Sequence, residues 1–179
     1  MKDLSLNVLD ITHNSISAKA SHITVALTDK NGEIRIRITD DGCGMSEEML
    51  RRVTDPFTTT RTTRRVGMGL PLLKMAAEQT GGSLAIDRRL GEGTEVEAVF
   101  VKDHIDCPPL GDMASTVSML MGAVPADCDL CYRYETESGE FSVSASEIRE
   151  ILGEDISLSE PEIQLWLNGY ITEQEKAIS

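Results

Sequence analysis

Four short segments of the chain carry residue types that could act on a phosphate-bearing ligand. The first contains Asp10 and Asn14, in a run whose apolar residues recur at near-helical spacing. Side chains four residues apart share one helix face. An amide oxygen is a suitable Mg²⁺ ligand, and a carboxylate can orient or deprotonate an attacking water. This pairing makes Asn14 a candidate metal ligand and Asp10 a candidate catalytic residue, although alone it is weak evidence; a merely capping or solvated carboxylate is the alternative for Asp10.

The second segment, residues 40–45, directly follows a strand-like run and reads Asp-Asp-Gly-Cys-Gly-Met. Glycines allow the backbone to approach a flat ligand closely, and a carboxylate at the end of a strand can accept a hydrogen bond from an adenine amine. Taken alone, the segment is also typical of a plain Asp/Gly turn. The residues that we expect at the ligand are Asp40, Gly42, Gly44 and Met45.

The third segment, residues 55–70, is rich in threonine and arginine and ends with two glycines before a helical run. Backbone N–H groups at a helix N-terminus favour phosphate, and arginine offers forked donors to it. A solvated basic loop is the alternative. The expected ligand contacts are Thr59, Arg61, Arg64, Gly67, Met68, Gly69 and Leu70.

The fourth segment, Gly-Glu-Gly-Thr at 91–94, is either a tight turn or a further contact through Thr94.

The elements that position these segments alternate between helix and hairpin patterns. Near-helical spacing predicts helices over 3–20 and 70–80, and a shorter one through Val53. Alternating apolar residues on either side of Asn31-Gly32 predict a hairpin, and the runs 83–87 and 95–101 predict another. Helices and hairpins in this order predict an α+β protein with a two-layer α/β sandwich.

The character of the chain changes after Lys102, so we expect a domain over 1–102 and an extension over 103–179. Pro108-Pro109 marks a joint. A Met-rich stretch predicts a helix over 110–122, in which Met113, Met119 and Met121 should fill the core. The remaining pattern predicts a hairpin of 130–134 with 141–145, followed by helices at about 145–152 and 160–169.

The net charge of −13 is concentrated in that extension. Residues 1–102 hold 14 Lys/Arg and 14 Asp/Glu, whereas residues 103–179 hold 3 and 16. Such an acidic surface argues against binding to nucleic acid or anionic lipid; it is either a solvated face or a patch for a basic protein partner. The sequence has no apolar run near the roughly 20 residues that span a bilayer and no secretory signal pattern, which predicts a cytoplasmic protein.

The four cysteines allow two interpretations. His104, Cys107, Cys128 and Cys131 could be read as a four-ligand zinc pattern. However, Cys107 precedes two prolines and Cys128 opens an apolar run. Free thiols that serve as small core residues are therefore the interpretation we favour.

Together, the four segments resemble the nucleotide-binding boxes of the gyrase, heat-shock chaperone, histidine kinase and mismatch-repair (GHKL) ATPases, over residues 3–102. The resemblance implies the Bergerat fold, with ATP and Mg²⁺ as ligands. It implies that Asp40 binds the adenine amine, that Asn14 ligates Mg²⁺ and that Thr94 lies near the base. Residues 54–69 would form a lid over the phosphates, and the glycines that shape the pocket would be Gly42, Gly44, Gly67 and Gly69. Pro71 departs from the family pattern and removes one possible N–H donor.

The resemblance leaves several functions open. Histidine kinases usually carry Asn where this chain has Asp10, and ATP-hydrolysing members carry Glu. None of His13, His22 and His104 is placed as a phosphoacceptor on a helical hairpin, so we do not expect autophosphorylation in cis. We expect a stand-alone ATPase or nucleotide-gated switch that engages a protein partner or forms a homodimer. The alternatives are a protein kinase acting in trans, like the anti-sigma-factor kinases, and an ATP-binding module without turnover. We also expect the acidic extension to cover an exposed edge or face of the sandwich.

Overall fold

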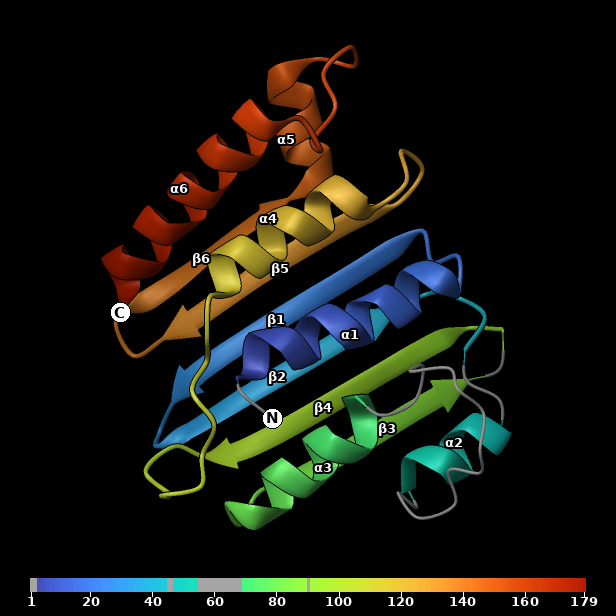
Figure 1. Ribbon diagram of the computed structural model, residues 1–179, viewed down its shortest axis with the longest axis vertical. Coiled ribbons are helices and arrows are strands. Elements are labelled where there is room, and N and C mark those ends of the chain that lie inside the picture. The colour runs from blue at the N-terminus through green and yellow to red at the C-terminus, as the bar shows by residue number, and fades with distance from the viewer. Residues whose placement is uncertain (1–2, 45–46, 55–68, 90) are drawn as a thin grey trace.

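A computed structural model of the chain describes residues 3–44, 47–54, 69–89 and 91–179. One mixed six-stranded sheet, in the order β3-β4-β2-β1-β5-β6, carries helices packed on one of its faces (Figure 1). This is the α+β sandwich that the sequence predicts. The elements are α1 (Leu4–Ser17), β1 (His22–Lys30), β2 (Glu33–Asp40), α2 (Glu47–Thr54), α3 (Gly69–Gln79), β3 (Ser83–Arg89), β4 (Gly93–Val101), α4 (Met113–Ala123), β5 (Asp129–Thr136), β6 (Gly139–Ser144), α5 (Ala145–Leu152) and α6 (Pro161–Ile178).

The β1–β2 hairpin forms around the predicted Asn-Gly turn. Asn31 and Gly32 have φ values of 55° and 75°, the left-handed conformation that a two-residue hairpin loop needs. Beyond the turn, every second residue of β2 is buried, as in Ile34, Ile36 and Ile38. This period of two turns one face of the strand toward the helices and the other toward solvent.

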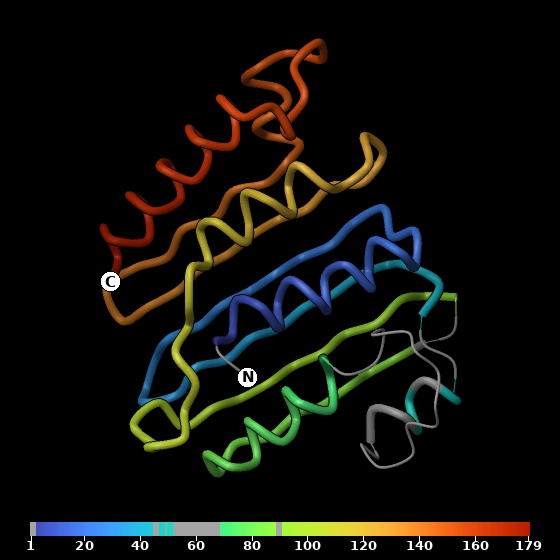
Figure 2. Tube along the Cα trace, in the orientation of Figure 1, coloured from blue at the N-terminus to red at the C-terminus, as the bar shows by residue number. Residues whose placement is uncertain are grey.

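The acidic extension adds β5 and β6 to the same sheet. β5 lies parallel to β1, with eight residue pairs from His22↔Asp129 to Asp29↔Thr136. Parallel neighbours require a crossover connection, and here α4 lies within it, as the trace in Figure 2 shows. The β1 strand therefore has hydrogen-bonded neighbours on both sides, β2 and β5.

The core lies between the sheet and the helix layer. Leu4, Val8 and Ile11 of α1 are buried, as are Val117 and Leu120 of α4. Cooperative packing of these apolar faces is the main source of helix stability in such a fold. The helix layer is continuous, because α4 contacts both α1 and α6.

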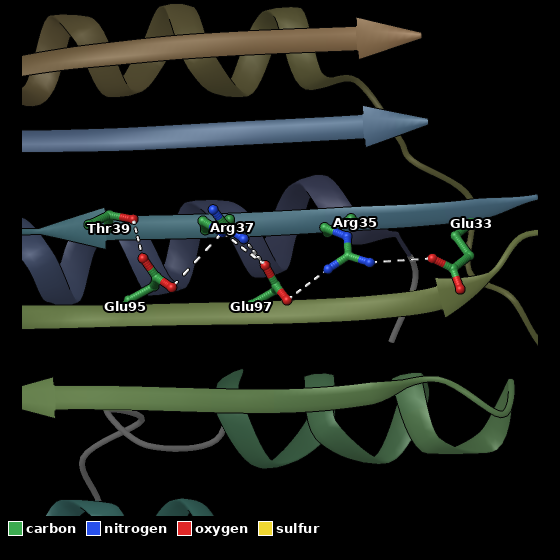
Figure 3. Close-up of polar contacts among 6 residues, drawn as sticks. All are labelled: Glu33, Arg35, Arg37, Thr39, Glu95 and Glu97. Carbon is green, nitrogen blue, oxygen red and sulfur yellow. Dashed lines mark hydrogen bonds and ion pairs between the residues drawn. The ribbon is translucent and has the colours of Figure 1, made fainter. Parts of the chain in front are cut away.

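The opposite face of the sheet carries a polar ladder (Figure 3). Arg35 Nη1 donates to Glu97 Oε1 at 2.9 Å, and Arg37 Nε donates to Glu97 Oε2 at 2.8 Å. Burial opposes ionisation of Glu97, but its hydrogen bond from Arg37 and the charges of both arginines lower its pKa overall. Cross-strand pairs of opposite charge stabilise a solvent-facing sheet surface modestly.

Several local predictions need correction. The last helix continues to Ile178 rather than ending near residue 169, and the first ends at Ser17 because a turn at Ala18 and Lys19 follows. Met119 is 52% exposed, since it lies on the outer side of α4, while Met113 and Met121 are buried as predicted.

The cysteines also differ in part from the prediction. All four are free; Cys128 is buried, Cys107 and Cys131 are half-buried, and Cys43 is exposed. Cys43 lies outside the core because it is in the loop after β2. Among the described residues, no group of three or more His, Cys, Asp or Glu side chains is arranged to hold a metal ion.

Candidate nucleotide-binding site

Helix α1 presents Asp10 and Asn14 beside the sheet. The helix begins at Leu4, and Asp3 is a favourable N-cap whose carboxylate accepts a hydrogen bond from the Leu6 backbone N–H. Its inward side buries Val8, Ile11 and other residues against the sheet. Asp10 is exposed and Asn14 is half-buried, so α1 holds both polar side chains at the margin of its buried face.

Asp40 ends β2, and its carboxylate accepts two hydrogen bonds from within the chain. Its Oδ2 accepts a hydrogen bond from Ser15 Oγ of α1 at 2.6 Å, and its Oδ1 accepts one from the Gly42 backbone N–H at 2.9 Å. Both partners are donors, which fixes the carboxyl as an acceptor. Each carboxylate oxygen has room for a second donor, so Asp40 can still accept a hydrogen bond from a ligand.

Two glycines allow the backbone to close around Asp40. A Cβ on Gly93, whose φ is 114°, would lie 1.9 Å from the Asp40 carbonyl oxygen. A Cβ on Gly42 would lie 2.9 Å from both the Cβ and the carbonyl oxygen of Ala18. A Cβ at either position would clash, so both glycines are required by a close approach, and at Gly93 the positive φ favours glycine as well.

These elements enclose a cavity of about 300 Å³ between α1 and strands β2 and β4. Asp40 and Thr94 lie directly opposite each other in the β2–β4 pairing. The volume is at the lower end of the range typical of small-molecule sites. Its lining combines a few polar groups with an apolar floor: Ile11, Asn14, Ser15, Ser17, Ala18, Ile38, Asp40, Cys43, Gly44, Thr94 and Val96.

The N-terminus of α3 lies against α1 at Asp10. A Cβ on Gly69, the first residue of α3, would be 3.4 Å from the Asp10 Cβ and 3.7 Å from its Oδ2. The unpaired N–H groups at a helix N-terminus attract anions. This places a carboxylate and an anion-binding helix end together, one turn of α1 away from Asn14.

Asp41 anchors the loop after β2 to the start of β1. Its Oδ1 accepts hydrogen bonds from the Ser21 and His22 backbone N–H groups at 2.7 and 2.9 Å. The His22 N–H is the main cause of a lowered pKa at Asp41, against the opposing effect of burial; the His22 ring and Ser21 add to it. A carboxyl with a lowered pKa stabilises the fold above its ordinary pKa, and that contribution is lost as the pH falls.

The structure brings some of the predicted site residues together and leaves others undescribed. Asn14, Asp40, Gly44 and Thr94 line the cavity. Gly42 and Leu70 are buried, and Asp10 lies with Gly69 at the α3 N-terminus. The remaining predicted residues lie outside the described part of the chain: Met45, Thr59, Arg61, Arg64, Gly67 and Met68.

Ser15 and Gly93 contribute to the site but were not predicted as site residues. Ser15 holds the Asp40 carboxylate, and Gly93 allows the approach of β4 to Asp40. Spacing within α1 gives no signal for Ser15, because its contact with Asp40 depends on how the helix crosses the end of β2. The signal for Gly93 is its position directly before Thr94.

Larger cavities exist, but their charges do not suit a triphosphate. One of about 880 Å³ near the ends of α4 and α5 is lined by Glu150, Glu154 and Asp155. Another of about 610 Å³ lies on the open face of the sheet, where Arg35 and Arg37 are paired with Glu97 and where Glu135 and Glu140 lie beside Arg133. Cavity size alone therefore does not locate the site.

Comparison with known proteins places the chain in a family. Residues 2–104 match the histidine kinase-, DNA gyrase B- and HSP90-like ATPases, and the chain belongs to this family. It contains an ATP-binding, histidine-kinase-like ATPase domain of the GHKL superfamily. The match ends close to Lys102, where the composition of the chain changes. Among the described helices, none has both the length and the apolar content to cross a membrane.

The relatives are sensor proteins and histidine kinases. A putative sensor protein of Shewanella frigidimarina is 30% identical over 96 residues, which cover 53% of this chain and 15% of that protein. The histidine protein kinase DivJ of Caulobacter vibrioides is 32% identical over 95 residues, which cover 50% of this chain and 16% of that protein. The chain thus spans less than a fifth of the length of either relative.

A solved structure shares the fold. The N-terminal domain of a DNA repair protein superposes with a TM-score of 0.55 at 15% identity, over 79% of this chain and 51% of that one. The share of this chain is larger than residues 2–104, so the similarity in fold extends into the acidic extension.

Proposed function

We propose that this chain binds Mg·ATP in the cavity around Asp40 and hydrolyses it, acting as a nucleotide-gated switch. The observation that carries the proposal is the placement of polar groups at two neighbouring positions beside α1. An acceptor carboxylate at Asp40 lies at the β2 end, and Asp10 with the α3 N-terminus lies about one helical turn beyond Asn14. A flat base at the first position directs a phosphate chain toward the second.

The adenine end is supported by the hydrogen bonds of Asp40. Ser15 and Gly42 each donate to one of its oxygens, so the group is held as an acceptor of fixed orientation. The amine of adenine is a donor and can bind to it. The apolar floor formed by Ile11, Ile38 and Val96 suits the face of a purine.

The donor set also fits Mg²⁺. In the described part of the chain, the Asn14 side-chain amide has no hydrogen-bond partner although it lines the cavity, which leaves its oxygen available as a ligand. Mg²⁺ commonly takes one or two protein ligands and completes its shell with phosphate oxygens and water. The ion supplies neutralisation of the phosphate charge when bound.

Asp10 is the proposed catalytic residue. Its carboxylate is exposed and next to the N-terminus of α3, where phosphate oxygens would be attracted. From there it can accept a hydrogen bond from a water molecule and orient it toward the terminal phosphate. Asp is one methylene shorter than the Glu of hydrolysing relatives, so we expect a slow enzyme.

The test is Asp10→Ala in the full chain. We expect the release of phosphate to fall by at least about 100-fold, because a positioned general base contributes roughly 10²- to 10⁴-fold. The affinity for ATP should change by less than about threefold, since Asp10 is away from the base pocket. Asp87→Ala, on the exposed part of β3, is the matched control. Undiminished turnover in Asp10→Ala would remove the base assignment.

Transfer of phosphate to a partner is the second candidate, and the names of the histidine kinase relatives favour it. The acceptor would lie on another protein, because His22 is held by Asp41 and the His104 ring accepts a hydrogen bond from the Asp106 N–H. Incubation with ATP labelled at the γ-phosphate separates the candidates: free phosphate supports hydrolysis and a labelled partner supports transfer. Binding without either product would leave a purely regulatory ATP module. In each case we place the protein in the cytoplasm.

A further inference from the structure

The outer side of α6 carries exposed apolar side chains, although the Trp166 ring also stacks on Tyr170 within the chain. Leu167 and Ile171 face inward and are fully buried. On the opposite side, Leu165 is 78% exposed and Trp166 is 45% exposed. Figure 1 shows α6 at the outside of the helix layer, beside the edge strand β6. Large exposed apolar side chains gathered on one helix face indicate an interaction surface.

Gly169 lies at the middle of that outer side. A Cβ built on it would meet no atom within 4 Å, so nothing in the chain requires a glycine at this position. Glycine within a helix is less favourable than alanine, because it loses more backbone freedom on folding. The absence of a side chain is useful where a second helix approaches the backbone closely.

Two charged residues lie symmetrically about Gly169. Glu162 is seven residues before it and Lys176 is seven residues after it, and both are exposed. Seven residues are close to two helical turns, so all three share the outer side. Neither charge has an ion-pair partner within the described part of the chain. Their signs suit the dipole of α6, but the dipole does not explain why they share a side with Gly169.

We propose that the outer side of α6 is the interface of a homodimer, in which two α6 helices pack antiparallel about a two-fold axis at Gly169. In this arrangement Glu162 of each copy faces Lys176 of the other, giving two equivalent ion pairs. A two-fold interface is self-complementary in this manner. Leu165 and Trp166 of both copies supply the apolar contact, and Gly169 permits the close crossing.

The charge of the extension makes the position of Lys176 informative. Residues 103–179 contain 16 acidic and 3 basic residues, so two copies repel each other unless opposite charges meet locally. Of the three cations, Arg149 donates to the Cys128 and Pro125 carbonyl oxygens, and Arg133 lies on the sheet. Lys176 alone lies on the outer side of α6, at the position that meets Glu162 in an antiparallel pair.

The test measures the mass of the full chain by sedimentation as a function of concentration. We expect a species of twice the 19.6 kDa chain mass at concentrations of about 100 µM. Trp166 is the only tryptophan in the sequence, so its fluorescence reports on this surface alone. Its emission should shift to shorter wavelength as the dimer forms, because the ring leaves water.

Three variants distinguish this specific interface from nonspecific association of apolar surfaces. Gly169→Gln should be monomeric while melting at or above the wild-type temperature, because glutamine is the better helix former. Lys176→Glu should weaken the dimer at least about tenfold by placing like charges together. The exchange Glu162→Lys with Lys176→Glu should restore it. Ile151→Ala, at a 72% exposed position on α5, is the control and should leave the dimer unchanged.

Each possible result either supports the proposed dimer interface or overturns it. Loss of the dimer in Gly169→Gln with rescue by the charge exchange supports the proposal. A wild-type chain that is monomeric at about 200 µM with nucleotide and without it overturns the proposal. A dimer that survives Gly169→Gln, or that the charge exchange fails to restore, also overturns it. These readouts do not depend on ATP binding or turnover.

Discussion

The two parts of the chain use polar residues in opposite ways. In the extension, polar side chains mostly complete their own neighbourhood: Ser144 and Glu147 form a capping box at α5, and Asp129 accepts hydrogen bonds from Ser146. In residues 3–102, Asp40 is held by two donors yet retains acceptor capacity toward a cavity, and the amide of Asn14 is unpaired within the described part of the chain. The difference is one of position: Asp129 directs its carboxylate to the start of α5, whereas Asp40 and Asn14 line a cavity that a ligand can enter.

The charges divide in the same way. The half that contains the cavity is electrically balanced, and the excess of negative charge lies in the half that completes the sheet. A triphosphate would be repelled by the carboxylates that line the cavity near α4 and α5. The site and the acidic surface are therefore built on different elements of one sheet, which lets each keep its own electrostatic character.

Among the changes that test this division of the chain, removal of the extension should have the largest effect on folding. A chain that ends after Lys102 loses all eight residue pairs between β1 and β5, together with the contacts of α4 on α1. We expect loss of cooperative thermal unfolding, because an exposed β1 edge and uncovered apolar surface favour aggregation. Circular dichroism and melting curves measure this. Co-expression of residues 103–179 as a separate chain is the control and should restore folding, whereas a soluble, fully folded fragment 1–102 would show that the extension is dispensable.

Asp40→Asn should affect binding strongly and the fold weakly. The amide keeps one acceptor oxygen but presents a donor toward the adenine amine, so affinity for ATP should fall at least about 100-fold. Asp41→Asn is the matched control, since the neighbouring carboxylate anchors the loop to Ser21 and His22. That variant should melt at lower temperature yet bind ATP within about threefold of wild type once folded. Tight binding by folded Asp40→Asn would contradict the placement of the base.

Glu175→Gln should give the smallest effect, and it concerns the extension alone. Tyr132 donates to Glu175 at 2.8 Å, and burial raises the pKa of the Glu175 carboxyl. A carboxyl that is harder to ionise in the folded protein lowers stability as the pH rises above its ordinary pKa. The variant should therefore melt about 1–3 °C higher at pH 7 and lose this advantage toward pH 4. Glu150→Gln, on the surface of α5, should show no such trend; an equal gain at both pH values would exclude ionisation as the cause.

The sequence predicts the local elements well because their signals are local. The Asn31-Gly32 turn and the alternation in β2 are enough for the first hairpin. The parallel pairing of β1 with β5 was beyond reach, because periodicity within a strand does not identify a partner about 100 residues away. Helix α6 extends beyond residue 169, where the sequence predicts its end, because packing of Leu167 and Ile171 carries this helix through Gly169.

In the candidate site, too, the features with local signals could be predicted and those that depend on the folded sheet could not. Asp40 and Thr94 stand out from residue type and position, and the β2–β4 register places them opposite each other. The contribution of Ser15 depends on how α1 crosses the end of β2, which no spacing within α1 reveals. Gly93 is required by the Asp40 carbonyl oxygen, a contact between backbones that only the folded sheet creates.

The central claim is that a purine amine binds the Asp40 carboxylate while the phosphates extend toward Asn14 and α3. Calorimetric titration of the folded full chain with Mg·ATP and Mg·GTP tests it most directly. Guanine presents a carbonyl oxygen where adenine presents its amine, so it would face the Asp40 carboxylate acceptor to acceptor. We predict saturable binding of ATP and binding of GTP weaker by at least about 100-fold. No uptake of ATP in the presence of magnesium, or equal affinity for both nucleotides, would contradict the account.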